Sequence, residues 1–321
     1  MGIELFMVVG FCLAAYSIVG NDVPQTLGTF ISSNAHRPWW ILWLYTSSIL
    51  AVVLMYGWWT SGVGDASYGR LATIPFPQQG ITWLYIVPPV LLIFLTKFGI
   101  PVSTTFLVLT IFSPSSLGAM LTKSMLGYAV AFVAALIIYR VVIKSVTIYF
   151  AKTRHLPTPK TWVAIQWIST AFLWSQWLIQ DLANIFVYVP RVVPLEFMLF
   201  AISVFIILLG IVFYQRGGAI QQIIDTKTGV ADIRSATIID FMYALILLVF
   251  KELSNIPMST TWVFLGLLAG REFAMSLHLH EVNKHRTSRN VSKDAMKLMI
   301  GLLMSILLAT TLPWIYHWIE G

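Results

Sequence analysis

Two stretches of sequence, IPVSTTFLVL at 100–109 and IPMSTTWVFL at 256–265, decide how the chain is organised. They are identical at six of ten positions and lie 156 residues apart in a chain of 321. A second pair, GNDVPQT at 20–26 and IQDLANI at 179–185, repeats at nearly the same distance, 159 residues. Two separate landmarks with almost the same offset indicate that the chain contains an internal duplication.

The composition places both copies in a membrane. Hydrophobic residues make up 58% of the chain and charged residues 10%, whereas a soluble domain has about 45–50% apolar and about 25% charged residues. This balance excludes a soluble enzyme, a disordered chain and a free nucleic-acid-binding protein. Runs such as AVAFVAALIIY at 129–139 are continuously apolar, unlike the alternating strands of a membrane barrel. We therefore predict an all-α integral membrane protein that crosses the lipid bilayer several times.

Ten apolar segments bounded by proline, glycine or charged residues form two series of five. The first series occupies 3–20, 40–59, 82–96, 100–113 and 118–150. The second series occupies 161–179, 194–214, 236–251, 256–270 and 294–318. We expect an N-terminal transmembrane repeat at 1–155 and a C-terminal transmembrane repeat at 156–321.

The distribution of positive charge gives the orientation of the two repeats. The strongly basic stretches 140–160 and 271–293 should both face the cytoplasm under the positive-inside rule. The first follows the fifth segment of its half, whereas the second precedes the fifth segment of its half. Equivalent segments then run in opposite directions, so the halves are predicted to be inverted repeats. This arrangement places both termini on the outer side of the cell membrane and the loop 215–235 in the cytoplasm.

The third and fourth segments of each half are unusually short. They contain 14 to 16 residues, fewer than the roughly 20 residues of a full span. Their tips, KFGIPVSTT at 97–105 and LSNIPMSTT at 253–261, combine helix breakers with hydroxyl groups. Irregular backbone at membrane depth occurs where it is buried in protein or lines a wet cavity. We favour discontinuous helices that form re-entrant hairpins, with full spans as the alternative.

Two aspartates, Asp22 and Asp181, lie near the ends of apolar runs at equivalent repeat positions. Amides flank both of them: Asn21 and Gln25 in the first half, and Gln180 and Asn184 in the second. An ionised carboxylate in the bilayer is costly unless a cation or several donors compensate it. Carboxylate, amide and carbonyl oxygens suit a hard cation such as Na⁺. The alternative is a loop aspartate that caps a following half-helix at 23–33.

The serine–threonine tips have the complementary chemistry. A proline at the start of a helix lacks an N–H group that would be unpaired there anyway. Free backbone N–H groups at a helix N-terminus, supplemented by hydroxyl donors, bind anions without a cationic side chain. Two such tips beside two aspartates predict a site for a small oxyanion and cations. The alternative is that the hydroxyls cap membrane helices.

These motifs resemble the signature of the inorganic phosphate transporter (PiT) family. That family carries GANDVANA-like and P-[VI]-STT motifs in each inverted half, and GNDVPQTLGT at 20–29 and the PVSTT and PMSTT stretches are similar to them. The resemblance covers motifs and repeat order across nearly the whole chain. Pro24 and Gln25 replace the usual alanine and asparagine, and Phe106 and Trp262 follow the triplets where histidine is common.

The resemblance implies Na⁺- or H⁺-coupled import of phosphate, or of sulfate in some members. Na⁺ is the expected coupling ion, held at Asp22 and Asp181, and no cofactor is predicted. The other partners considered are the bilayer and, in a homodimer, a second copy of the chain. The cation-binding residues are predicted to be Asn21, Asp22, Asp181 and Asn184. The substrate-binding residues are predicted to be Gln25, Thr26, Ser103, Thr104, Thr105, Gln180, Ser259, Thr260 and Thr261.

Two other classes of membrane protein were weighed against a symporter. An anion channel or a non-transporting sensor could use the same scaffold. A membrane enzyme is not expected, because six scattered histidines cannot form the three histidine boxes of a desaturase. The sequence also has no recognisable pair of nucleophile and base. Among transporters, a permease for sulfate or another small oxyanion on the same fold remains the alternative.

Overall fold

The structure is a computed structural model that describes residues 2–62, 64–98, 100, 102–141, 153, 159–218, 220–221, 233–278 and 284–320. Within these ranges the chain forms helices and connecting turns, and it contains no strand. The prediction of an all-helical protein is therefore confirmed. The described residues leave out most of the basic stretches 140–160 and 215–235, and residues 279–283 of the basic stretch 271–293.

Eight long helices account for most of the described chain. They are α1 (Gly2–Ser33), α2 (Trp39–Thr60), α5 (Leu117–Val141), α7 (Lys160–Asp181), α9 (Leu195–Tyr214), α11 (Ile233–Leu253), α12 (Thr260–His278) and α13 (Lys284–Glu320). Shorter elements are η1 (Trp83–Ile86), α3 (Val87–Lys97), the π-helical turn η2 (Thr105–Leu109), α4 (Thr110–Phe112), η3 (Pro114–Ser116) and α8 (Ala183–Phe186). Among the described residues, six helical stretches are long and apolar enough to cross a membrane.

Helix α1 continues well beyond the apolar segment expected at 3–20. It passes through Asp22 and includes Pro24 in its interior. The alternative of a loop aspartate capping a half-helix at 23–33 is therefore wrong, because Asp22 lies within one continuous helix. Proline removes one helical hydrogen bond and tends to kink the helix. The amide of Gln25 occupies part of the disturbed turn by donating from Nε2 to the Asn21 carbonyl at 2.9 Å.

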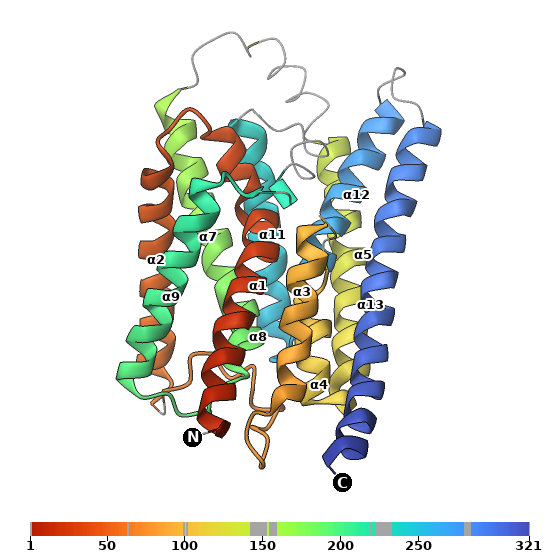
Figure 1. Ribbon diagram of the computed structural model, residues 1–321. Coiled ribbons are helices and arrows are strands. Elements are labelled where there is room, and N and C mark those ends of the chain that lie inside the picture. Colours follow the sequence, from red (N-terminus) through yellow and green to blue (C-terminus); the bar gives the residue numbers. More distant parts are fainter. Residues whose placement is uncertain are drawn as a thin grey trace.

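The short third and fourth segments of the first half form a hairpin. The chain rises through α3, turns between residues 98 and 104, and returns through η2 and α4 (Figure 1). The ring centroids of Tyr85 and Phe112, which lie near the beginning and end of this hairpin, are 4.5 Å apart. Both ends therefore lie at the same level of the bundle.

The corresponding elements of the second half are longer than the sequence indicated. Helix α11 has 21 residues and α12 has 19, against the 14 to 16 expected. Polar and charged residues near their ends, such as Arg234 and Glu252 in α11 and Arg271 in α12, extend each helix past its apolar run. The chain still turns back, because Ile239 on α11 and Arg271 on α12 line the same small cavity.

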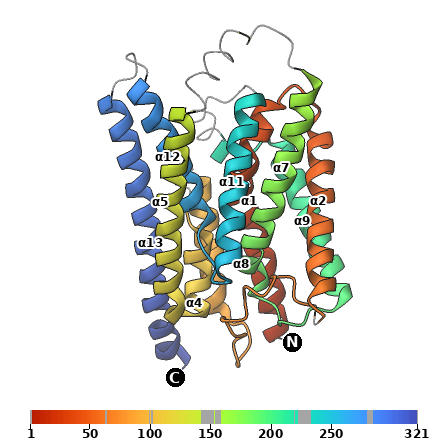
Figure 2. The same cartoon turned by 180° about the vertical axis from the view of Figure 1, so that it is seen from behind.

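The long helices pack against one another in pairs. Helix α1 contacts α3 while α7 contacts α11, and α5 packs along α12 (Figures 1 and 2). Both termini and the connection 61–82 lie at the lower end of the bundle in Figure 1. We refer to this as the terminal end. The C-terminal ends of α5, α9 and α12 lie at the opposite end of the bundle.

Glycines on α12, such as Gly266, allow this helix to pack closely against α5. A Cβ atom added at Gly266 would lie 2.5 Å from the carbonyl oxygen of Tyr128 on α5. Small residues of this kind allow membrane helices to approach closely, where van der Waals packing and hydrogen bonds hold them together. Large apolar side chains such as Val52, Ile207 and Leu303 are exposed on the outer faces, as expected for surfaces in contact with lipid. Polar side chains are instead concentrated in the interior.

Candidate functional site

The structure buries every residue that the sequence predicted for the site. None of the thirteen side chains is more than 4% exposed. Asp22 lies in the second half of α1, and Asp181 is the last residue of α7. The first serine–threonine triplet leads into η2 and the second leads into α12. Side chains that are far apart in the sequence thus meet in the centre of the bundle.

Asp22 is tied to the first tip by hydrogen bonds. Asn21 donates from Nδ2 to Asp22 Oδ1 at 2.6 Å and to the Val102 carbonyl at 2.9 Å. Thr104 donates from Oγ1 to Asp22 Oδ2 at 2.9 Å. The carboxylate therefore accepts from its neighbour on α1 and from a tip hydroxyl, which fixes its orientation inside the bundle.

Asp181 joins the same network through the second half. Asn184 donates from Nδ2 to Asp181 Oδ1 at 2.8 Å, and also to Thr104 Oγ1 at 3.0 Å and Thr105 Oγ1 at 3.2 Å. Thr105 in turn donates to Asp181 Oδ1 at 3.5 Å. The path Asp22–Thr104–Asn184–Asp181 connects the two aspartates through a tip of one half and an amide of the other.

The two tips hold each other by a reciprocal pair of contacts. Thr105 donates from Oγ1 to the Met258 carbonyl at 3.2 Å, and Thr261 donates from Oγ1 to the Val102 carbonyl at 3.4 Å. The two donors, Thr105 and Thr261, are 156 residues apart, and so are the two acceptors, Val102 and Met258, so the contacts are equivalent under the repeat. The rings of Phe106 and Trp262, another equivalent pair, meet edge to face with centroids 5.5 Å apart.

The serines of the two triplets act as helix caps. The backbone N–H of Phe106 donates to Ser103 Oγ at 3.3 Å, and that of Trp262 donates to Ser259 Oγ at 3.3 Å. A serine oxygen that accepts a bond from the N–H three residues later satisfies one of the unpaired donors of a helix start. For these two residues the capping role weighed in the sequence analysis is present. The threonines, in contrast, face the aspartates and the opposite tip.

Four oxygen atoms at the site are buried and have no hydrogen-bond partner in the described part of the chain. They are Gln25 Oε1, Gln180 Oε1, Asp181 Oδ2 and Asn184 Oδ1. Buried polar atoms are nearly always paired, so each exception calls for an explanation. All four atoms are acceptors that cannot donate. A set of amide and carboxylate oxygens of this kind fits a hard cation such as Na⁺.

Gln180 and Thr26 lie at the margin of the network. Gln180 donates from Nε2 to the Leu247 carbonyl on α11 at 2.9 Å, which turns its amide away from the tips. Thr26 is buried, but its hydroxyl has no hydrogen-bond partner. The structure thus places both residues near the site without joining them to the aspartates.

Three buried charged residues were missed by the sequence analysis. Asp240 on α11 is buried and accepts from the hydroxyls of Thr29 and Thr170. Arg70 and Lys123 lie against the backbone just before the second tip. Asp240 and Lys123 each interrupt an apolar run, which was a usable signal. Arg70 lies in the glycine-rich connection 61–82, where nothing in the sequence indicates that it is buried.

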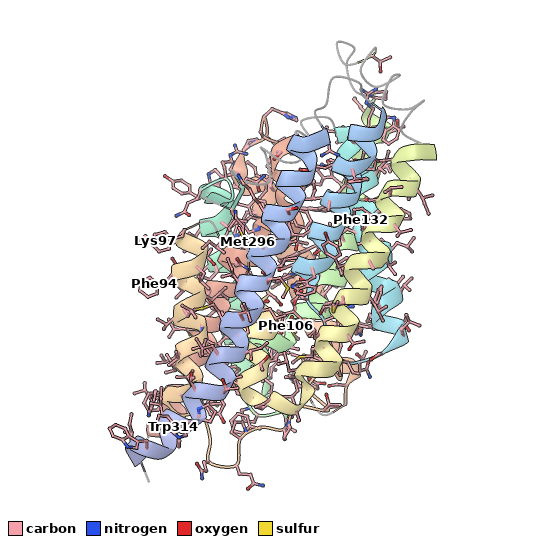
Figure 3. All side chains as sticks on the ribbon, turned by 90° about the vertical axis from the view of Figure 1, so that its right-hand side faces the viewer. Phe94, Lys97, Phe106, Phe132, Met296 and Trp314 are labelled. Carbon is pink, nitrogen blue, oxygen red and sulfur yellow. The ribbon has the colours of Figure 1, made fainter. Side chains whose placement is uncertain are left out.

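A cavity of about 370 Å³ reaches toward the site from the end of the bundle opposite the termini. Gly20 and Thr96 form part of its wall, together with Gln215 and Gly217 just after α9. Thr96 donates to Asn21 Oδ1 at 3.4 Å, so the cavity wall is one hydrogen bond from the network. Figure 3 shows Phe106 in the interior of the bundle, whereas Phe94 and Lys97 point away from it.

The fold, with six helical stretches able to cross a membrane in the described residues, and the buried polar centre define a multi-pass helical membrane protein. A solved structure titled "The sodium-dependent phosphate transporter" matches 99% of this chain and 100% of its own, with a TM-score of 0.62 and 16% sequence identity. At this identity the match shows a shared fold, so the resemblance noted in the motifs is confirmed at that level. The matched protein is a transporter and not an enzyme. No protein-family model and no curated protein sequence match the chain.

Proposed function

We propose that this protein is a symporter that imports inorganic phosphate together with Na⁺. The observation that carries the proposal is the buried network in which two equivalent aspartates share the threonines of a serine–threonine tip. The shared fold with a sodium-dependent phosphate transporter supports the same conclusion. A second oxyanion, sulfate, is the competing substrate because hydroxyl and N–H donors serve both tetrahedral anions.

Na⁺ would first bind the oxygens that lack donors. Asp181 Oδ2 and Asn184 Oδ1 lie on the same helical turn, and Gln25 Oε1 is at the position equivalent to Asn184. A cation there would compensate carboxylates that are costly to keep ionised inside a membrane. It would also remove the repulsion that two aspartates exert on an incoming anion. Cation binding therefore precedes anion binding in the proposed order.

The threonines would then turn from the aspartates to the anion. Thr104 now donates to Asp22, and Thr105 donates to Asp181 and to Met258. Carboxylate oxygens that coordinate Na⁺ no longer need these donors. The released hydroxyls, with backbone N–H groups at the starts of η2 and α12, form an anion site of the kind found at helix N-termini. This exchange of hydrogen-bond partners couples the binding of the anion to the binding of Na⁺.

The reciprocal contacts of the tips support two inverted repeats, at 1–155 and 156–321, with re-entrant hairpins that meet at the centre. In transporters of this kind, one bundle moves against the other around a fixed site. With the termini outside, the cavity beside Gln215 and Gly217 faces the cytoplasm. In the proposed orientation this cavity would be part of the route toward the cytoplasm.

The experiment that tests the proposal is uptake of labelled phosphate into proteoliposomes with and without an inward Na⁺ gradient. We expect Na⁺-dependent uptake that excess sulfate leaves largely unchanged. Asp22→Asn should abolish coupled uptake, because it removes one buried carboxylate and its contact with Thr104. Glu252→Gln is the matched control, since it removes the same charge at a side chain that is 63% exposed.

Three outcomes would contradict the proposal. Uptake of sulfate without phosphate would move the substrate to the competing oxyanion. Normal uptake by Asp22→Asn would remove the cation role of that residue. Flux faster than carrier turnover, or phosphate binding without flux, would indicate a channel or a sensor.

A further inference from the structure

Two cationic side chains at the terminal end converge on one backbone oxygen. Arg70 donates from Nη1 to the Ile256 carbonyl at 3.3 Å, and Lys123 donates from Nζ to the same oxygen at 2.8 Å. Lys123 also donates to the Ser254 carbonyl at 2.6 Å. Ile256 directly precedes the PMSTT stretch. The pair therefore lies at the entrance to the second tip from the terminal end.

The Arg70 side chain is buried with most of its donors unused. The residue is 1% exposed, and its Nε and Nη2 atoms have no hydrogen-bond partner. Nε and Nη2 form one edge of the guanidinium, the edge that binds two oxygens of a carboxylate or phosphate at once. Burial lowers the pKa of this guanidinium to about 10, so it remains positively charged at neutral pH.

The two neutral carbonyl oxygens of Ser254 and Ile256 do not compensate two positive charges. Burying like charges together is costly unless an opposite charge offsets them. Arg70 interacts electrostatically with Asp181, but its hydrogen bonds do not reach that carboxylate. Lys123 has three donors and uses two of them on backbone carbonyls. An anion with several oxygens would satisfy the free edge of Arg70 and the third donor of Lys123.

Arg191 also contacts the connection 61–82, but the edge of its guanidinium is fully used. Arg191 donates from Nε and Nη2 to the Ile74 carbonyl at 3.2 and 2.8 Å, and from Nη1 to the Val189 carbonyl at 2.8 Å. Its guanidinium edge is therefore occupied by backbone, and it fastens the connection 61–82 to the chain after α8. Arg70 has the same side chain without such partners.

We propose that Arg70 and Lys123 form a second oxyanion site, which receives the tetrahedral anion at the terminal end before it reaches the threonines of the central site. This inference rests on the proposed function, because it takes the same oxyanion as the ligand. The Ile256 carbonyl holds the two cations in the present conformation. When the anion binds, Arg70 and Lys123 release the Ile256 carbonyl and donate to the oxygens of the anion instead. The backbone next to the second tip is then held less firmly.

The test compares Arg70→Gln, Arg70→Lys and Lys123→Met with the wild type and with Arg191→Gln as the matched control. The KM for phosphate in Na⁺-driven uptake is the first readout. We expect Arg70→Gln and Lys123→Met to raise it about tenfold, the size of one or two lost charge-assisted hydrogen bonds. Arg70→Lys should recover part of the loss, and Arg191→Gln should keep the wild-type KM even where it lowers thermal stability.

A second readout separates this inference from the transport function. Thermal unfolding of the purified full chain is followed in sodium-free choline medium with added phosphate, sulfate or gluconate. We expect phosphate and sulfate, but not gluconate, to raise the melting temperature of the wild type, and Arg70→Gln to abolish the effect. Na⁺-induced stabilisation should be retained in Arg70→Gln, which also shows that the variant is folded.

Each outcome decides between the alternatives. A wild type that transports neither anion refutes the proposed function, while anion stabilisation that depends on Arg70 still supports this site. A KM within twofold of the wild type in folded Arg70→Gln and Lys123→Met overturns the inference. The absence of anion stabilisation in the wild type, or equal stabilisation of Arg70→Gln, overturns it as well.

Discussion

The reciprocal contacts between the two tips lead to an asymmetric prediction for two equivalent substitutions. Thr105→Val and Thr261→Val each remove one hydroxyl and keep the shape of the side chain. The Met258 carbonyl has the Thr105 hydroxyl as its donor, whereas the Val102 carbonyl accepts from both Thr261 and Asn21. Thr105 additionally donates to Asp181. Thr105→Val should therefore lower the free energy of unfolding more than Thr261→Val does.

Magnitudes follow from the bonds that each variant loses. Interhelical side-chain hydrogen bonds in membrane proteins contribute about 0.6 kcal/mol on average and up to about 1.7 kcal/mol. Thr261→Val removes a 3.4 Å bond to an oxygen that keeps a second donor, so we expect a loss of about 0.5 kcal/mol. Thr105→Val leaves a buried carbonyl unpaired and takes a donor from a carboxylate, so we expect a loss of about 1–2 kcal/mol.

The assay is reversible unfolding of the purified protein in mixed detergent micelles, with the free energy of unfolding compared between the two variants. Thr310→Val on α13 is the control, because its hydroxyl is exposed and bonds within its own helix. It should change the free energy by less than either tip variant. Equal losses at residues 105 and 261, or a larger loss at residue 261, would refute the reasoning from shared acceptors.

Two further predictions concern cation binding and packing. Na⁺ should raise the melting temperature of the wild type, since a ligand that binds only the folded state stabilises it. Asn184→Ala should reduce that shift, because it removes one unpaired oxygen and the donor to Asp181; an unchanged Na⁺ shift would exclude residue 184 from the cation site. Gly266→Val should destabilise the bundle by about 1–3 kcal/mol, since even a Cβ there would meet the Tyr128 carbonyl at 2.5 Å. Wild-type stability in that variant, measured by the same unfolding assay, would show that α5 and α12 separate easily.

The sequence predicted the helical membrane fold and the residues of the central network because both leave direct signals. Long apolar runs define spans, and a duplicated motif marks the residues that meet at a shared centre. Asp22 and Asp181 were identified because a carboxylate in an apolar run is unusual. Their partners Thr104 and Thr105 were identified because the triplet occurs twice.

Other features depend on tertiary contacts that one sequence does not reveal. The length of α1 was underestimated, because Asn21, Asp22 and Pro24 suggested a break that packing in the bundle overrides. The buried position of Arg70 could not be predicted, since its connection looks like an exposed loop. Ser103 and Ser259 cap helices, whereas the threonines face the aspartates and the opposite tip, and this difference appears only when the direction of each hydroxyl is known.

The reciprocal bonds between Thr105 and Met258 and between Thr261 and Val102 have an evolutionary consequence. A contact in which residue i meets residue j, and the equivalent of i meets the equivalent of j, is what a two-fold axis produces between identical subunits. Two copies of a half-length ancestor could have made this pair of bonds before the genes were fused. Separate expression of the two proposed repeats would then be expected to restore an assembled protein, because the proposed two-fold axis makes the centre of the molecule equivalent to a subunit interface.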